Sequence, residues 1–284
     1  MQTIRSTNQL REQIAIWRSE KYRISFVPTM GNLHAGHLAL VKQAQQISDR
    51  VVVSIFVNPM QFGEGEDYQN YPHTQNEDSQ KLQAMGVDFL FMPDVSVIYP
   101  AGVENTTRVE VPDVSDGLCN DFRPGHFTGV ATVVARLFNL VQPDFAVFGS
   151  KDYQQLAVIR KMVSELCFPI QIEAVETVRE ADGLAMSSRN QYLDRSQRET
   201  APELYRALNQ MADVLRGGGR DYAAIEKNTL HTLEKAGFSP DYVSIREKST
   251  LALPKRDIQT GWVILAAARL GKARLIDNLE VSFS

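Results

Sequence analysis

Two histidines, His34 and His37, follow a short apolar segment and a glycine-containing turn. Apolar residues then recur at helical spacing, so the histidines would lie on the first turn of a helix over residues 36–48. Residues three apart share one face of a helix, and the free N–H groups at its start attract anions. Imidazole donates hydrogen bonds to phosphate oxygens as charge builds on them. The pattern favours chemistry on a nucleotide phosphate.

The same pair has simpler interpretations, namely an incidental surface pair or part of a metal site. The zincin pattern H-E-x-x-H is not present, and Cys119 and Cys167 stand at no zinc-ligand spacing. A structural zinc site is therefore disfavoured.

Polar residues also follow two other apolar segments. Asn58 and Gln61 come after residues 51–57, and Lys151, Asp152 and Gln155 come after residues 145–148. A lysine suits phosphate, and a neighbouring carboxylate suits Mg²⁺. A Lys-Asp dipeptide is also a common surface ion pair, and amide side chains often satisfy backbone groups instead. Their place after strand-like segments is what favours a role in the site.

A later segment offers two hydroxyls and a guanidinium, from Ser187, Ser188 and Arg189, and these groups suit phosphate oxygens. Serine is also a common helix cap, so the segment alone is weak evidence. Residues 123–127 pair an arginine with His126, to which we assign no role.

Short apolar segments alternate with helical patterns over the first two thirds of the chain. We expect strands at residues 24–27, 51–57, 87–92 and 145–148, and helices at 36–48, 75–85, 129–141 and 152–166. This alternation predicts an α/β fold with a Rossmann-like, doubly wound parallel sheet. Ligands then bind beyond the carboxyl ends of the strands, at a topological switch point.

The pattern changes after about residue 176. We expect helices at residues 195–216 and 221–236, separated by three glycines, and then strands at 242–245, 262–267 and 273–276. The sequence thus predicts a first domain over residues 1–176 and a smaller α+β domain over 177–284.

Composition excludes several classes. With 43% hydrophobic and 23% charged residues, the chain has the make-up of an ordinary globular protein. A net charge of −4 argues against a general nucleic-acid binder, so a small molecule is the expected partner. Two distant cysteines suggest no disulfide framework, and no signal-peptide or membrane-span pattern is visible. We expect a cytoplasmic protein.

Together these segments resemble the pantoate–β-alanine ligase (pantothenate synthetase) family. The matching segments are residues 28–37, 57–62, 123–127, 149–155 and 186–190, and residues 274–278 are also similar. His-x-Gly-His alone would indicate only the wider nucleotidyltransferase superfamily, whereas the full set is specific. The family commonly has glutamate where Ser150 stands. The contact that this glutamate would make is therefore not expected here, but the activity is, because Lys151 and Asp152 are present.

The resemblance implies ATP-dependent condensation of pantoate with β-alanine through an enzyme-bound pantoyl adenylate, giving pantothenate, AMP and pyrophosphate. His34, His37 and Lys151 would be catalytic, and Gln61, Gln155 and Asn58 would bind the pantoate and β-alanine substrates. Asp152 would hold Mg²⁺ with ATP, and the smaller domain would close over the site of a homodimer. The ATP-binding residues implied are Met30, Gly31, Asn32, Leu33, His34, Ala35, Gly36, His37, Gly149, Ser150, Lys151, Asp152, Val178, Met186, Ser187, Ser188 and Arg189.

Three alternatives remain open from the sequence. A nucleotidyltransferase acting on a phosphate-bearing acceptor would consume no amine. A class I aminoacyl-tRNA synthetase is disfavoured because no basic tRNA-binding face is evident. A nucleotide-sensing module without turnover would be expected to lack the phosphate-contacting residues, yet His34, His37 and Lys151 are present.

Overall fold

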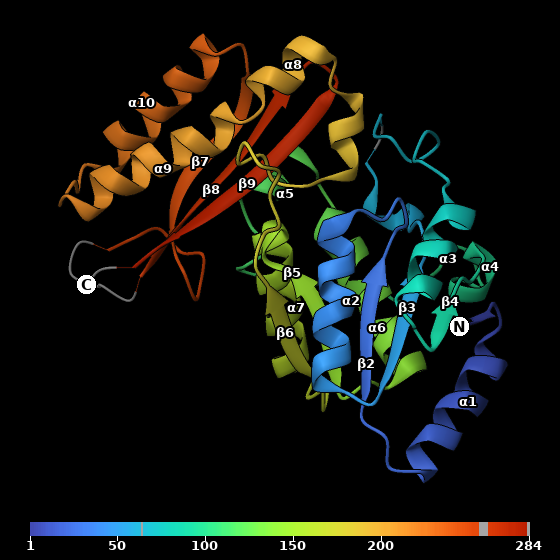
Figure 1. Ribbon diagram of the computed structural model, residues 1–284. Helices are drawn as coiled ribbons and strands as arrows, with labels where there is room; N and C mark the ends of the chain where they lie inside the picture. The colour runs from blue at the N-terminus through green and yellow to red at the C-terminus, as the bar shows by residue number, and fades with distance from the viewer. Residues whose placement is uncertain (64, 256–260, 283–284) are drawn as a thin grey trace.

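The computed structural model describes residues 1–63, 65–255 and 261–282, and they form two sheets (Figure 1). One sheet has six parallel strands in the order β1-β4-β3-β2-β5-β6, and the other has three antiparallel strands in the order β7-β8-β9. The predicted fold class, a parallel α/β sheet with a smaller α+β part, is confirmed.

The parallel sheet consists of β1 (Gln2–Ile4), β2 (Ile24–Thr29), β3 (Arg50–Ile55), β4 (Phe89–Phe91), β5 (Phe145–Gly149) and β6 (Gln171–Val175). Its inner strands are almost entirely buried, which explains their continuous apolar sequences. The two edge strands were not predicted. β1 has three residues, and no residue of β6 is fully buried, so neither produces an apolar run.

Helices cover both faces of this sheet. They are α1 (Thr7–Ser19), α2 (Ala35–Ile47), α3 (Gln75–Ala84), α6 (His126–Val141) and α7 (Tyr153–Glu165), with the short α4 (Val95–Ile98) and α5 (Cys119–Phe122). Side chains of α2 and α3 pack in one apolar core, and those of α1, α6 and α7 pack in another. The two cores, one on each face, are what a doubly wound sheet requires.

The topological switch lies at β2, which pairs with β3 on one side and with β5 on the other. The chain passes from β2 through α2 to β3, and later from β5 through α7 to β6 on the opposite side. The starts of α2 and α7 therefore diverge from the carboxyl ends of β2 and β5, which leaves a crevice there.

The smaller part contains α8 (Arg195–Thr200), α9 (Glu203–Arg216), α10 (Tyr222–Lys235), β7 (Ser239–Glu247), β8 (Trp262–Leu270) and β9 (Ala273–Val281). The two long helices lie along its sheet (Figure 1). Their side chains and those of the sheet form a second apolar core. No helix in the described part of the chain combines the length and apolarity needed to cross a membrane.

The prediction of one helix over residues 195–216 was wrong, because two helices, α8 and α9, occupy this range. The break falls at Ala201 and Pro202. Proline has no N–H to donate to the preceding turn, and its ring excludes the carbonyl that a continuous helix would place there. The three glycines beginning at Gly217 end α9 as expected.

Candidate active site

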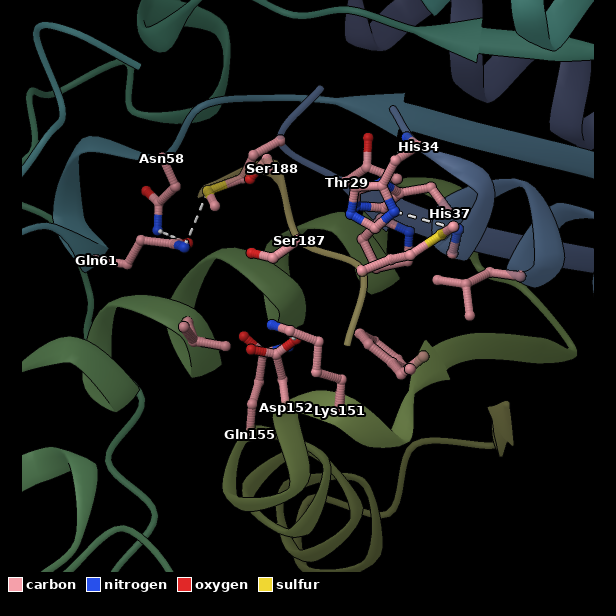
Figure 2. Close-up of a pocket in the computed structure, with 18 of the residues that line it drawn as sticks. Thr29, His34, His37, Asn58, Gln61, Lys151, Asp152, Gln155, Ser187 and Ser188 are labelled. Atoms are coloured by element: carbon pink, nitrogen blue, oxygen red, sulfur yellow. Dashed lines mark hydrogen bonds and ion pairs between the residues drawn. The ribbon is translucent and has the colours of Figure 1, made fainter. Parts of the chain in front are cut away.

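A pocket opens at the carboxyl ends of β2, β3 and β5 and beside the segment that follows β6 (Figure 2). Most of the predicted site residues line it: Met30, His34, Gly36, His37, Asn58, Gln61, Gly149, Lys151, Asp152, Gln155, Val178, Met186, Ser187, Ser188 and Arg189. Figure 2 shows the histidines on one side, the Asn58–Gln61 pair on another, and Lys151 with its neighbours facing them. The structure thus brings together segments that lie far apart in the chain.

His34 caps the start of helix α2, and His37 lies on its first turn. Both rings accept hydrogen bonds from backbone N–H groups at this end of the helix. The ring Nδ1 of His34 accepts a hydrogen bond from the Gly36 N–H at 3.1 Å, and Nδ1 of His37 accepts one from the His34 N–H at 3.3 Å. An accepting nitrogen carries no proton, so each neutral ring has its proton on Nε2. The ring centroids are 4.1 Å apart. Each imidazole therefore has an Nε2–H to donate.

Both rings are held neutral near pH 7. Burial lowers the pKa of His34 to about 4, with the charge of Lys151 acting in the same direction. Burial also lowers the pKa of His37 to about 3, helped by its neighbour His34. Each ring is therefore a neutral group with an N–H to donate, and Lys151 is the cation beside them.

The turn before these histidines is held by Asp78, a fully buried residue of α3. Its carboxylate accepts hydrogen bonds from the N–H groups of Asn32 and Leu33, both at 2.8 Å. Gly31 adopts a φ of +86°, which only glycine takes without strain. Gly31, Asn32 and Leu33 do not line the pocket, so their assignment to ATP binding remains a prediction.

Two other predicted residues also lie outside the pocket lining. Ala35 is exposed, and the backbone carbonyl of Ser150 accepts a hydrogen bond from Asn278 at 2.8 Å. Ser150 thus contributes a main-chain contact to the fold.

Lys151 and Asp152 lie on the 3-10 helix η2 (Ser150–Asp152), directly after β5. Their charged atoms are 3.9 Å apart, with side-chain exposures of 18% and 47%. The Asp152 side chain is thus half-exposed, and Glu176 is the other carboxylate among the lining residues. Among the described residues no group of three or more acidic, histidine or cysteine side chains forms a metal cage.

Gln61 ends the 3-10 helix η1 (Pro59–Gln61), after β3. The Asn58 amide donates to the Gln61 side-chain oxygen at 3.1 Å, and the Tyr99 hydroxyl donates to Asn58 at 2.7 Å. The Gln61 NH₂ group in turn donates to the Met30 sulfur at 3.1 Å, a weak acceptor, so the orientation of the amide is fixed and its second N–H faces the pocket. Asn58 is 1% exposed and has protein partners for both of its amide atoms.

Arg123 and His126, which received no role from the sequence, lie behind Gln61. The His126 Nδ1–H donates to the Gln61 carbonyl at 2.8 Å, and its Nε2 accepts from Arg123 at 3.0 Å. Glu66 pairs with the Arg123 guanidinium at 2.5 and 2.7 Å. Burial lowers the pKa of His126 to about 4, so this ring is neutral as well. The pair therefore supports the backbone of Gln61.

The segment after β6 forms the remaining wall. The N–H of Met186 donates to the Val178 carbonyl at 2.9 Å, which closes a hairpin. Ser187 then caps the 3-10 helix η3 (Ser188–Tyr192) by accepting from the Arg189 N–H. The Arg189 guanidinium pairs with Asp67 at 3.1 Å.

Sequence reasoning missed the apolar wall of the pocket. One face of α6 supplies Val130, Val133, Val134 and Leu137, and Phe56 and Tyr71 add aromatic surface. Their helical spacing was visible, but it has the same form as an ordinary core stripe. Only the position of α6 beside the crevice distinguishes a pocket wall from a stripe of core residues.

The sequence matches the family described as pantoate-beta-alanine ligase over residues 2–280. A pantothenate synthetase of Pseudomonas aeruginosa (strain UCBPP-PA14) is 54% identical over 281 residues, which cover 99% of each chain. One from Stutzerimonas stutzeri is 56% identical, over 99% of this chain and 98% of that one.

Two solved structures are similar to this chain over almost its whole length. The crystal structure of pantothenate synthetase from Thermus thermophilus superimposes with a TM-score of 0.91 at 48% identity, covering 99% of this chain and 100% of that one. A pantoate-beta-alanine ligase from Francisella tularensis, complexed with beta-gamma ATP and beta-alanine, gives 0.80 at 34% identity, covering 99% and 97%.

Proposed function

The chain belongs to the pantoate–β-alanine ligase family, and from this premise we propose how the residues of its pocket carry out the reaction. The enzyme is a ligase that joins pantoate to β-alanine at the expense of ATP. The observation that carries the assignment of roles is the convergence of His34, His37 and Lys151 on one pocket with Gln61 and Gln155.

The reaction proceeds in two steps. A pantoate carboxylate oxygen attacks the α-phosphorus of ATP, the bond to the bridging oxygen breaks, and pyrophosphate leaves. The β-alanine amine then attacks the carbonyl carbon of the pantoyl adenylate, forms the amide, loses a proton and expels AMP. The first step needs alignment and charge stabilisation more than a protein nucleophile.

We assign charge stabilisation to the two histidines and Lys151. The Nε2–H groups at the start of α2 and the Lys151 ammonium would face the phosphates of the same nucleotide. Such donors act where negative charge develops, and the low pKa of each histidine keeps its ring in the donating neutral form. Ser187, Ser188 and Arg189 would contact the phosphates from the opposite wall, and Val178 would meet the adenine.

Pantoate would bind at the other end of the pocket. Asn58 orients the Gln61 amide, and the NH₂ group, whose protein acceptor is the weak Met30 sulfur, would donate its second N–H to a carboxylate or hydroxyl oxygen. Gln155, on the first turn of α7, would provide the second amide. Asn58 itself would act through Gln61, because its own amide atoms already have protein partners.

A divalent ion, Mg²⁺, fits this pocket as a partner of ATP. Mg²⁺ is usually held by one or two carboxylates together with substrate phosphates, and Asp152 and Glu176 are the carboxylates of the lining. The ion would neutralise phosphate charge when bound. Asp152 would orient it beside Lys151.

Three broader features belong to the same proposal. We place the domain boundary at residue 176, with residues 177–284 closing over the pocket, because the helices and sheet of the smaller part enclose a second apolar core, while Val263 and Leu265 of β8 pack against the first part. We also propose a homodimer in the cytoplasm. Size-exclusion chromatography with light scattering would test the dimer, and a mass near 31.9 kDa would contradict it.

Product analysis by mass spectrometry tests the assigned activity. The protein is incubated with Mg·ATP, pantoate and β-alanine, and each component is omitted in turn. Pantothenate, AMP and pyrophosphate should form only in the complete mixture. Intact ATP across the whole panel would overturn the assignment.

A further inference from the structure

Strand β9 of the smaller sheet reaches the pocket from behind, through a residue that does not line it. The Asn278 side-chain amide donates to two successive backbone carbonyls, that of Ser150 at 2.8 Å and that of Lys151 at 2.9 Å. Asn278 is 7% exposed. Both hydrogen bonds are shielded from water and fix the turn that carries Lys151.

The preceding residue, Asp277, holds a second pocket segment. Its carboxylate accepts two hydrogen bonds from Arg179, at 2.7 and 2.9 Å, and its side chain is 3% exposed. Arg179 also donates to the Gly183 carbonyl at 3.0 Å, and its guanidinium stacks on Tyr205 at 3.5 Å. A bidentate, stacked arginine has little freedom to move. Asp277 therefore fixes the hairpin that ends at Met186.

The two anchors are mechanically coupled. Asp277 and Asn278 are neighbours on one strand, and the Asn278 N–H donates to the Asp277 carboxylate at 2.8 Å. Asn278 anchors the Lys151 turn, and Asp277 anchors the Val178–Met186 hairpin. The turn and the hairpin form different walls of the pocket. Any shift of β9 would displace both walls together.

We propose that Asp277 and Asn278 are positioning residues for the nucleotide half of the site, setting the distance between Lys151 and the hairpin wall. This inference rests on the proposed function. It assigns a role in catalysis to the smaller sheet, although neither residue lines the pocket. Gln61 follows β3 and is supported by His126, so this part of the pantoate half should be independent of the clamp, whereas Gln155 lies on α7 just after the Lys151 turn.

The first test is Asn278→Ala, compared with the matched control Ser244→Ala. Ser244 lies in the same sheet, is 8% exposed and contacts Glu226 and Arg246 of the smaller part. Loss of two buried hydrogen bonds should raise KM for ATP about tenfold or more and lower kcat, because Lys151 is no longer held. KM for pantoate should rise clearly less than KM for ATP, because only Gln155 adjoins the Lys151 turn, and Ser244→Ala should leave both KM values near wild type.

The second test uses Asn278→Asp, which keeps the size of the side chain. The ionised carboxylate cannot donate and faces two carbonyl oxygens, whereas the protonated form can donate one hydrogen bond. Burial and the adjacent Asp277 favour that protonated form, with Lys151 and Arg179 opposing. The ratio of KM for ATP, variant over wild type, should therefore fall as pH drops from 8.5 to 6, with wild type at each pH correcting for other titrations.

Binding of an ATP analogue with a methylene α,β bridge, measured by calorimetry, provides a readout separate from turnover. Weaker binding by Asn278→Ala, with normal thermal unfolding, supports the clamp. Unchanged analogue binding and KM, or equal losses for ATP and pantoate, would overturn it, and so would a pH-independent Asn278→Asp ratio. Absence of pantothenate with the wild-type enzyme would instead mean that the proposed function fails.

Discussion

Three histidines in and behind the pocket are neutral, and they donate from different ring nitrogens. His34 and His37 accept backbone hydrogen bonds at Nδ1 and so offer Nε2–H, whereas His126 donates from Nδ1 to a carbonyl. The backbone partner selects the tautomer in each case. The same residue type can therefore serve as a phosphate donor at the start of α2 and as a support for Gln61 behind the pocket.

The tautomer of His37 leads to a graded prediction. His37→Ala should slow pantoyl-adenylate formation by about 10²–10³-fold, the usual scale for one transition-state donor. His37→Gln should retain more activity than His37→Asn, because the glutamine amide nitrogen lies near the Nε2 position and the asparagine nitrogen lies near Nδ1. Single-turnover quench-flow measures the rates. Equal rates for the two amide variants would argue against Nε2 as the donor, and near wild-type adenylation by His37→Ala would rule out the role.

Gln61 and Gln155 should recognise pantoate together. Replacing both with alanine should raise KM for pantoate about tenfold or more, since each side chain is expected to contribute roughly 1 kcal/mol through hydrogen bonds. KM for ATP should change little. Steady-state kinetics with each substrate varied in turn separates the two effects, and an unchanged affinity for pantoate would show that the assignment is wrong.

At the level of elements, the position of Gln61 depends on how closely α6 approaches η1. A Cβ placed on Gly129 would lie 2.3 Å from the Met60 carbonyl oxygen and 2.7 Å from the Gln61 nitrogen. The Gly129 carbonyl also accepts a hydrogen bond from Asn58 at 3.1 Å. The glycine thus lets the helix that forms the apolar wall contact the turn that carries Gln61.

Gly129→Ala should therefore push η1 away from α6. We expect a loss of stability of about 1–3 kcal/mol, the usual cost of overpacking, and a larger increase in KM for pantoate than for ATP. Urea denaturation and steady-state kinetics provide the two readouts. Gly63→Ala is the matched control, because the added Cβ there meets only the Glu66 side chain at 3.9 Å. Similar kinetics for both variants would contradict the packing argument.

At the scale of the whole molecule, the buried histidines couple stability to pH. Burial lowers the pKa of His37 to about 3 and that of His126 to about 4, against an ordinary value of 6.5. Below pH 6.5 the unfolded chain takes up protons that the folded protein does not bind. Stability is therefore full above about pH 6.5 and is lost as pH falls towards the folded-state values.

We expect the free energy of unfolding to fall between pH 6.5 and 5 by up to about 1.4 kcal/mol per pH unit for each such histidine. Urea denaturation across this range measures the slope. His126→Gln should lower this slope by the equivalent of about one bound proton, even if the substitution also changes the stability at pH 7. A slope of zero for the wild type would contradict the neutral state of the buried rings.

Much of the molecule was predictable from local sequence. Apolar runs marked the inner strands, helical periodicity marked α2, α6, α7 and α10, and the strand ends carried the polar residues that line the pocket. These signals are visible because burial imposes its pattern residue by residue. The quoted motifs also identified the family, which the comparisons confirm.

Other features arise only when distant segments meet. The edge strands β1 and β6 have too few buried residues to produce a pattern, and an α6 pocket wall is indistinguishable from a core stripe. Contacts from His126 to Gln61, from Asp78 to the turn before His34, and from Asn278 to Lys151 join residues 46 to 127 positions apart. Sequence by itself determined which groups could perform the chemistry and which strands would carry them. The tertiary structure alone decided which nitrogen, amide or carbonyl each group presents, because that depends on hydrogen-bond partners supplied by other elements.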